Sequence, residues 1–190
     1  MMNREEALVI LKDTVTERSL MQHSLAAEAV MNGLAGHFGE DAEKWGLTGL
    51  LHDLDYPQTA DEPARHGLLT AEMLAGKLPD DALQAIRAHN GEMNGTAVLS
   101  RFDTALRCGE TVTGLITAAS LVRPTGIDGM QVSSIKKKMK DKAFAASVDR
   151  DVIRECTDIG LSLEEFLGIA INAMAERGDE LGLKKPVPAA

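Results

Sequence analysis

The chain has 190 residues, of which 44% are hydrophobic and only 3% aromatic, and its formal net charge is −9 at pH 7. A chain of this length buries one substantial core, so we expect a single domain. The acidic surface argues against sequence-independent nucleic-acid binding, which depends on basic residues, and it favours a small-molecule substrate. The many Leu, Ala, Ile, Val and Met residues favour helices over strands, which predicts an all-α fold.

The cysteines and the N-terminus bear on the compartment. Cys108 and Cys156 are too few for a disulfide framework and are expected to be buried packing residues. Residues 1–13 mix charges with Leu and Ile and lack the apolar core of a secretory signal. No uncharged stretch reaches the roughly 18 to 20 residues that span a bilayer. We therefore expect a cytoplasmic protein without membrane contact.

Apolar residues at helical spacing predict three helices before residue 55, over 4–13, from 16 or 17 to about 36, and over 41–54. The second helix carries His23. The third ends ahead of Pro57, because proline disfavours helix in the residue that precedes it. Its last turn therefore carries His52 and Asp53.

Two further helices open with acidic residues and a proline, a composition typical of a first helical turn. The helix predicted over 61–76 carries His66, and the helix over 80–89 ends at His89. Later helices are predicted over 102–122, 133–140 and 149–159, followed by one that opens with the capping box Ser162 to Glu165. The tail 184–190 contains two prolines and is expected to be loose.

The dipeptide His52-Asp53 offers a nitrogen and an oxygen ligand side by side. Adjacent helical residues point about 100° apart, so the two can share a metal ion only at a helix end. The pair alone is equally consistent with a structural role, in which His52 interacts with the helix dipole and Asp53 caps the helix.

Further candidate ligands surround this pair along the chain. His23 lies upstream on an otherwise apolar helix, and His66, His89 and Glu110 follow, each on its own predicted helix. Imidazole and carboxylate ligands suit Mn, Fe, Zn, Co or Mg. His37 stands between two glycines at a helix end and falls outside this series.

The order His23, then Leu50-Leu51-His52-Asp53, then a carboxylate in an Ala/Leu-rich helix resembles the HD superfamily of metal-dependent phosphohydrolases, whose pattern is H…HD…D. The segments 140–145 and 156–161 and the C-terminal helix extend the likeness to a subgroup of small bacterial HD proteins. The resemblance implies a compact multi-helix bundle. It predicts one HD domain over 1–183, with a metal-site core at about 17–122 and C-terminal helices over 131–183.

The last ligand departs from the family pattern. The family segment resembles A-D-x-L-T-G-L-I, whereas residues 109–116 read G-E-T-V-T-G-L-I. The register of Thr113 to Ile116 assigns the ligand to Glu110, which keeps an oxygen ligand on a longer side chain. Asp103 is the rival, although an acid in a first helical turn is also favoured by the helix dipole. A solvent-facing Glu110 is the remaining alternative.

His66 and His89 resemble the extra histidines with which some HD families, including the HD-GYP group, bind a second metal. The resemblance then implies that Asp53 bridges two ions that clamp a phosphate and activate water. The alternatives are a surface His66 and a His89 that serves as a cation at a helix C-terminus. The implied cofactor is one or two divalent transition-metal ions, Mn, Fe, Co, Ni or Zn, with Mg possible.

The substrate phosphate needs positive charge, and candidates are Arg65, Arg123, Lys138 and Lys142. The lysine run 136–142 is also explained as a solvated face.

The resemblance implies hydrolysis of a phosphoester in a nucleotide or another small phosphorylated metabolite, with Asp53 and His52 as catalytic residues. Asp53 would be both a metal ligand and the base that orients water. The alternatives are a regulatory metal- or ligand-binding HD module with little activity, and a purely structural metal. Substrate, metal identity, oligomeric state and physiological role stay open.

Overall fold

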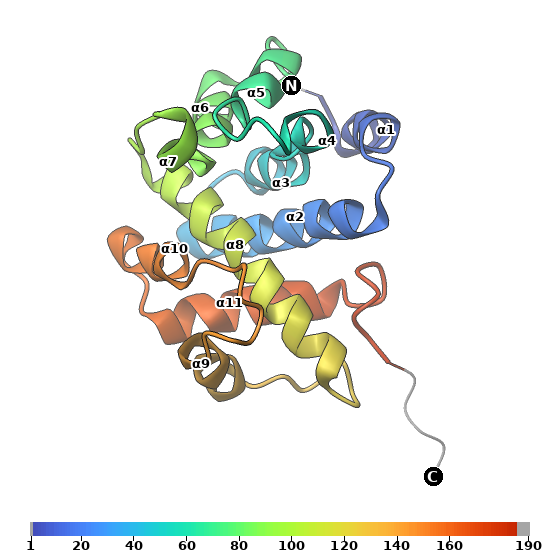
Figure 1. Cartoon of the computed structure of the whole chain (residues 1–190), viewed down its shortest axis with the longest axis vertical. Helices are drawn as coiled ribbons and strands as arrows, with labels where there is room; N and C mark the ends of the chain where they lie inside the picture. Colours follow the sequence, from blue (N-terminus) through green and yellow to red (C-terminus); the bar gives the residue numbers. More distant parts are fainter. Residues whose placement is uncertain (1, 186–190) are drawn as a thin grey trace.

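The computed structural model describes residues 2–185 (Figure 1), and over these residues it is all-α, as predicted. None of the helices within 2–185 combines the length and apolar character needed to cross a membrane. The α-helices are α1 (Arg4–Thr14), α2 (Arg18–Phe38), α3 (Ala42–Leu51), α4 (Tyr56–Thr59), α5 (Leu68–Met73), α6 (Asp80–His89), α7 (Gly91–Asn94), α8 (Arg101–Val122), α9 (Val132–Lys140), α10 (Arg150–Arg154) and α11 (Leu163–Glu176). A 3-10 helix, η1 (Glu155–Ile159), follows α10 directly.

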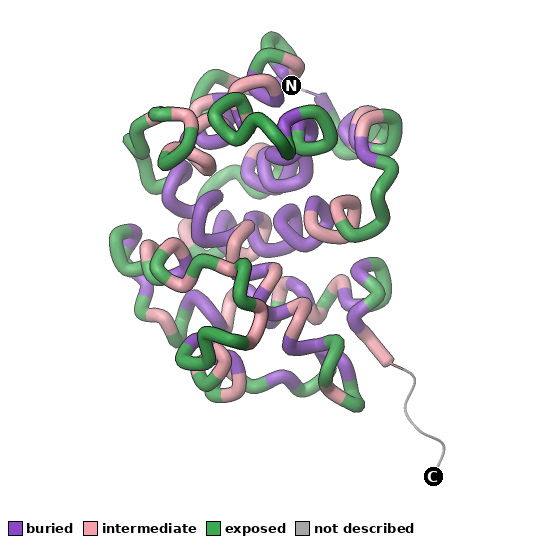
Figure 2. The backbone as a smooth tube through the Cα atoms, in the orientation of Figure 1, coloured by how far each residue is buried: buried purple, intermediate pink, exposed green. Residues whose placement is uncertain are grey.

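Helix α2 lies at the centre of the bundle, between α3 and α11, and α8 packs against it (Figure 1). The middle of α2, residues 24–31, is buried without a break, as its colour shows in Figure 2. Its apolar residues form a continuous core with those of α3, α6, α8 and α11. Burial on nearly every side of this middle part explains its high Leu, Ala, Val and Met content.

The approach of α3 to α2 depends on a glycine. A Cβ atom on Gly49 would lie 2.7 Å from the carbonyl oxygen of Ala27, so any side chain there would push the helices apart. This close contact sets the end of α3 beside α2. His52, the residue that follows α3, is thereby brought next to His23 on α2.

Two predictions for residues 51–76 were wrong in detail. Helix α3 ends at Leu51, so His52 and Asp53 lie in a turn just after the helix. Pro57 does not end α3 but lies in the first turn of the short α4. The helix predicted from residue 61 begins only at Leu68, because residues 61–67 form turns that place His66 outside any helix.

The remaining helices follow the prediction with two differences. The single helix expected over 149–159 is divided into α10 and η1, and a short α7 stands where a loop was expected. The capping box at Ser162 is present. Lys184 pairs with Gly126 in an isolated antiparallel bridge and is therefore part of the folded unit. The Lys185 ammonium donates to the Leu121 carbonyl oxygen, and residues 186–190 of the tail predicted to be loose lie outside the described residues.

Candidate metal centre

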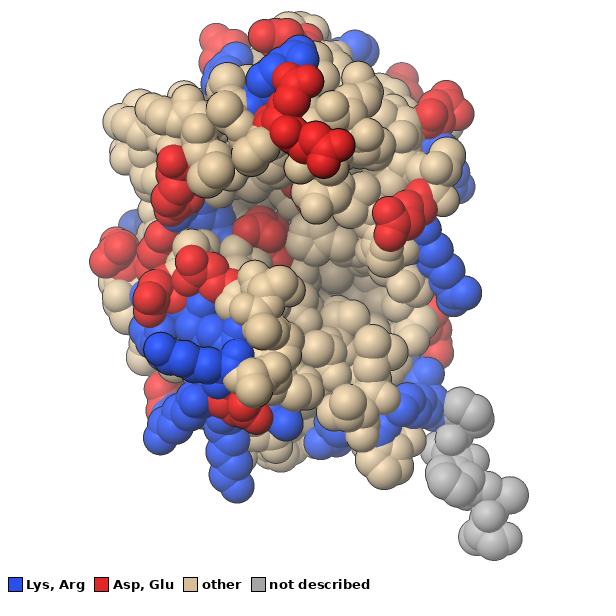
Figure 3. All heavy atoms as spheres, in the orientation of Figure 1, with Lys and Arg blue, Asp and Glu red and all other residues tan. Residues whose placement is uncertain are grey.

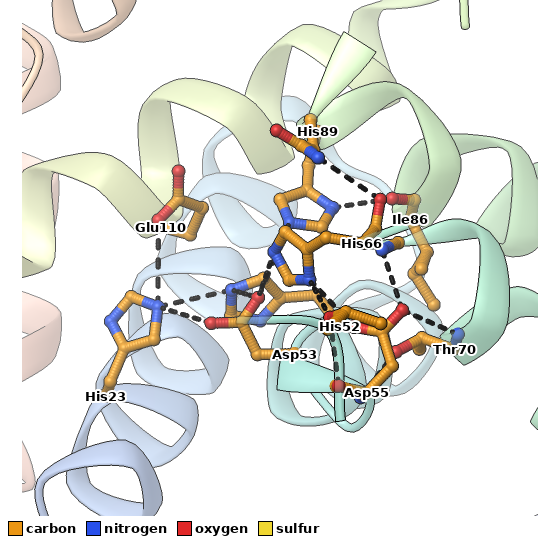
Figure 4. Close-up of polar contacts among 12 residues, drawn as sticks. His23, His52, Asp53, Asp55, His66, Thr70, Ile86, His89 and Glu110 are labelled. Carbon is orange, nitrogen blue, oxygen red and sulfur yellow. Dashed lines mark hydrogen bonds and ion pairs between the residues drawn. The ribbon is translucent and has the colours of Figure 1, made fainter. Parts of the chain in front are cut away.

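His23, His52 and Asp53 meet in space although 29 residues separate the two histidines (Figure 4). The Nε2 atoms of His23 and His52 are 3.2 Å apart. The Asp53 carboxylate completes the group, with Oδ2 3.4 Å from His23 Nε2 and Oδ1 3.2 Å from His52 Nε2. Two imidazole nitrogens and a carboxylate at this spacing form a ligand set for one divalent ion.

A second group shares the same carboxylate. Oδ1 of Asp53 lies 3.3 Å from Nε2 of His66 and 3.4 Å from Nε2 of His89, and these two nitrogens are 3.0 Å apart. His66 comes from the turn before α5, and His89 is the last residue of α6. Asp53 therefore stands between two potential metal positions.

All four imidazoles point Nε2 into the cluster while Nδ1 contacts a fixed group. The Nδ1 contacts are His52 with Gly49 O (2.8 Å), His89 with Ile86 O, His66 with Asp55 Oδ1 (2.7 Å) and His23 with Thr113 Oγ1 (3.0 Å). A hydrogen-bond acceptor at Nδ1 favours the neutral tautomer whose Nε2 lone pair can bind a metal. Metal-ligating histidines usually have such a partner at the other ring nitrogen. The donor set thus fits divalent transition-metal ions.

Asp55 is part of this arrangement, although the sequence was interpreted only as a turn at that position. Its carboxylate is fully buried and accepts hydrogen bonds from the backbone N–H groups of Gly67 (2.8 Å) and Thr70 (3.0 Å), besides contacting His66. Gly67 has φ 82°, a left-handed conformation that favours glycine. Asp55 therefore both stabilises the turn before α5 and orients the His66 imidazole. The signal in the sequence was an acid two positions after Asp53.

Thr113 was read only as part of the family register, yet it contacts a candidate ligand. Its hydroxyl donates to the Glu110 carbonyl oxygen at 2.6 Å, one helical turn back. The oxygen lone pairs are then free to accept from Nδ1 of His23. The T-G-L-I register of the sequence thus has a physical basis, because Thr113 orients His23.

Glu110 faces His23 and is not solvent-facing. Its Oε2 lies 3.6 Å from His23 Nε2, its side chain is 18% exposed, and its other oxygen accepts from Thr111. It belongs to neither three-residue group. The rival Asp103 is buried at the start of α8, where it accepts hydrogen bonds from Leu99 N and Ser100 Oγ. Asp103 is therefore a helix-start residue, as the alternative interpretation held.

The cluster also shifts the pKa values of its members. Burial lowers the pKa of His52 to about 3, so this imidazole is neutral at pH 7. Burial opposes charge on His66 as well, but its hydrogen bonds to Asp53 and Asp55 outweigh it and raise the His66 pKa to about 10. Although burial would raise the pKa of Asp53, the nearby imidazoles, His52 first, hold it well below its usual range. Burial raises the pKa of Glu110.

Of the four histidines in the cluster, His23 is the most exposed. The His52 side chain is completely buried, whereas that of His23 is 25% exposed. A depression of about 290 Å³ lies against His23 and Glu110, and its far wall is the segment 147–149. Water and a small molecule can therefore reach the cluster from the His23 side.

The structure does not bring all the predicted phosphate-binding residues to this opening. Arg123 lies about 20 Å along α8 from Glu110, and its guanidinium donates to the backbone of the turn at 126–128. The Lys138 ammonium lies 3.9 Å from the centre of the Phe144 ring. The prediction for Arg123 is therefore corrected to a structural role, and that for Lys138 stays a prediction. Lys142 lines a hollow on the other side of the segment 147–149. Arg65 pairs with Glu62 on the surface.

Arg107 supports the second group, and sequence reasoning missed it. This side chain on α8 is only 3% exposed, and its Nη1 donates to the carbonyl oxygens of Ala88 (3.1 Å) and His89 (3.3 Å). Its guanidinium also pairs with Glu92 and, at 2.7 Å, with Glu155. Arg107 thus satisfies the C-terminal carbonyls of α6 and fixes the backbone that carries His89. The sequence signal was a lone basic residue between apolar ones.

The fold and this site define a class of protein. The family model described as the HD domain matches residues 20–141, which include His23, the His52-Asp53 pair, His66, His89 and Glu110. The chain therefore belongs to the HD-domain family, as the sequence pattern predicted. Comparisons with curated proteins and with solved structures gave no match.

Proposed function

We propose that the protein is a metal-dependent phosphohydrolase that acts on a phosphoester of a small metabolite, a nucleotide or a related compound. One observation carries the proposal: four imidazole Nε2 atoms converge on the single carboxylate of Asp53 in two groups. Membership of the HD-domain family, whose members are generally metal-dependent hydrolases, supports the same reaction class.

The proposed ligands are His23, His52 and Asp53 for one ion and Asp53, His66 and His89 for the other, with Glu110 beside His23. Divalent ions at these positions would lower the pKa of water and neutralise charge on the phosphoryl oxygens. Asp53, whose pKa is held low, stays ionised and would orient the attacking water. His52 stays neutral at pH 7 and keeps its Nε2 lone pair available.

The open side of the cluster fits this chemistry. His23 and Glu110 border the depression through which a phosphoester would enter, and Lys142 stands beyond the segment 147–149. We propose Lys142 as the cation that attracts the phosphate, since it forms no ion pair within the described residues 2–185. We further propose that the protein acts in the cytoplasm, where the free thiols of Cys108 and Cys156 would stay reduced.

The test is metal removal and replacement. We expect the purified protein to hydrolyse members of a phosphoester panel, to lose this activity on dialysis against a chelator, and to regain it with Mn²⁺, Fe²⁺, Co²⁺, Ni²⁺ or Zn²⁺. Metal content measured by plasma mass spectrometry should approach two ions per chain. Tight metal binding without turnover on the whole panel would reject the hydrolase and favour a regulatory module.

Metal uptake should release protons. Because the His66 pKa is raised to about 10, His66 is protonated in the metal-free protein at pH 7, and a metal ion must displace that proton. We expect release of about one proton or more per chain at pH 7. The apparent metal affinity should rise with pH up to about 10. Calorimetric titrations in buffers of different ionisation enthalpy measure the release, and identical heats in all buffers would contradict it.

A further inference from the structure

A groove of about 340 Å³ runs beside His23, between the first half of α2 and the second half of α8. Figure 3 shows this face of the molecule hollowed between these two helices. Ala26 and Ala118 line its sides, and Leu181 and Leu183 from the turn after α11 close it. Its volume falls at the lower end of the range for small-molecule pockets, about 300 to 1,000 Å³.

The groove continues from the metal centre. His23 and Gly114 line both the groove and the depression that holds Glu110. The Nε2 side of His23 faces the cluster, while its Nδ1 is held by Thr113, which also lines the groove. A phosphoester with its phosphoryl group at the cluster can therefore extend past Gly114 into the groove.

Apart from the His23 imidazole, the walls of the groove are uncharged. Within residues 2–185, no Asp, Glu, Lys or Arg side chain lines it. Of the polar side chains that line it, Ser19 donates to Glu17 and Thr113 contacts His23. Gln22 and Thr117 also line it, and neither forms a side-chain hydrogen bond to another described residue. An ionised group in such a place would lose its hydration without a partner, whereas an uncharged group gains from burial. The two free polar groups can bind hydrogen-bonding atoms of a neutral ligand.

The hollow on the other side of the segment 147–149, of about 640 Å³, provides little free positive charge for a second phosphate. Arg150 donates to backbone carbonyls of the segment 141–148, among them that of Ala145 at 2.7 Å. Arg154 pairs with Asp151 at 2.7 Å. Among the described residues that line this hollow, Lys142 is then the one cation without an ion pair or hydrogen bond, and it is the residue proposed above to attract the phosphoryl group itself.

Building on the hydrolase proposal, we propose that the groove is the subsite for the organic part of the substrate. That part is uncharged and partly apolar, and Gln22 and Thr117 are its specificity-determining contacts. The substrate class is then a phosphomonoester whose ionised group is the phosphoryl group alone, and not a di- or triphosphate.

The experiment measures binding, which separates it from turnover. Phosphonates keep the anionic head but have a P–C bond, so they are not hydrolysed as esters. Titration calorimetry compares phenylphosphonate, methylphosphonate and 1,4-phenylenebisphosphonate on the Mn²⁺-loaded full chain. We expect phenylphosphonate to bind about tenfold more tightly than methylphosphonate, because its ring is buried in the groove. The bisphosphonate should bind at least about tenfold more weakly than phenylphosphonate, because its second charge enters an uncharged groove.

Ala118→Leu fills the groove, and Ala75→Leu, at an exposed position remote from the groove, is its matched control. We expect Ala118→Leu to remove the preference for phenylphosphonate while the affinity for methylphosphonate stays unchanged, and Ala75→Leu to retain both. Equal affinities in the wild type, or an intact preference in Ala118→Leu, would overturn the subsite. A protein that shows the preference but hydrolyses no ester would keep the subsite and lose the hydrolase.

Discussion

Asp53→Asn is expected to abolish metal-dependent turnover, by about a thousandfold or more, because one carboxylate serves both proposed ions. Its two oxygens lie 3.2 to 3.4 Å from the Nε2 atoms of four histidines. The amide keeps the shape of the side chain but loses the charge, so both metal positions should be weakened together. Metal content per chain after dialysis and turnover on the best phosphoester measure the effect.

The matched control is Asp13→Asn, a change of the same kind at an exposed residue of α1. It should leave metal content and turnover at the wild-type level. A variant Asp53→Asn that retains two ions, or that loses one ion and keeps its activity, would show that Asp53 does not bridge. A far-ultraviolet circular dichroism spectrum would establish that the helices persist in both variants.

Asp55→Asn is expected to lower the free energy of unfolding of the metal-free protein by about 3 kcal/mol at pH 7. The fully buried carboxylate accepts from Gly67 N and Thr70 N and contacts His66 Nδ1 at 2.7 Å. An amide leaves one of these donors opposite an N–H₂ group. Since the His66 orientation depends on Asp55, the affinity for the second ion should also fall, by about 10- to 100-fold.

Denaturant unfolding in the presence of chelator measures the stability term, and metal titration measures the affinity. The sign of the pH dependence is a further check. Although burial opposes it, the His66 contacts lower the Asp55 pKa below 3.8. The stabilisation by the ionised Asp55 carboxylate is then present above pH 3.8 and is lost as the pH falls through the lowered pKa. The difference in unfolding free energy between the wild type and Asp55→Asn should therefore shrink in acid. Asp61→Asn, on the exposed turn nearby, is the control, and equal stabilities of the two variants would contradict the prediction.

The long helices were predictable because periodicity reports burial. The helices that carry His23 and Glu110 repeat apolar residues at 3.6-residue spacing, and the structure places them within two residues of their predicted bounds. The segment 52–67 was not predictable in the same way. Its shape comes from tertiary hydrogen bonds to Asp55 and from the left-handed Gly67, which leave no periodic signal in the sequence.

Some residues of the candidate site were likewise predictable from the sequence, and others were not. The series His23, His52, Asp53, His66 and His89 stood out because these residue types are rare in apolar helices, and the structure brings them together. Residues that orient them were missed, because Arg107 and Asp55 act through contacts between distant segments. The prediction for Arg123 failed for a different reason. Arg123 directly follows the helix that carries Glu110, but it lies about 20 Å along that helix from Glu110.

The spread of the proposed ligands over several helices has one more consequence. An unfolded chain holds His23, the pair at 52–53, His66 and His89 too far apart to share an ion, so metal would bind the native state alone. By mass action, each tenfold rise in free metal above the dissociation constant would then add about 1.4 kcal/mol to the unfolding free energy. The lifetime of the protein against heat and proteolysis would therefore follow the supply of transition metal in its surroundings.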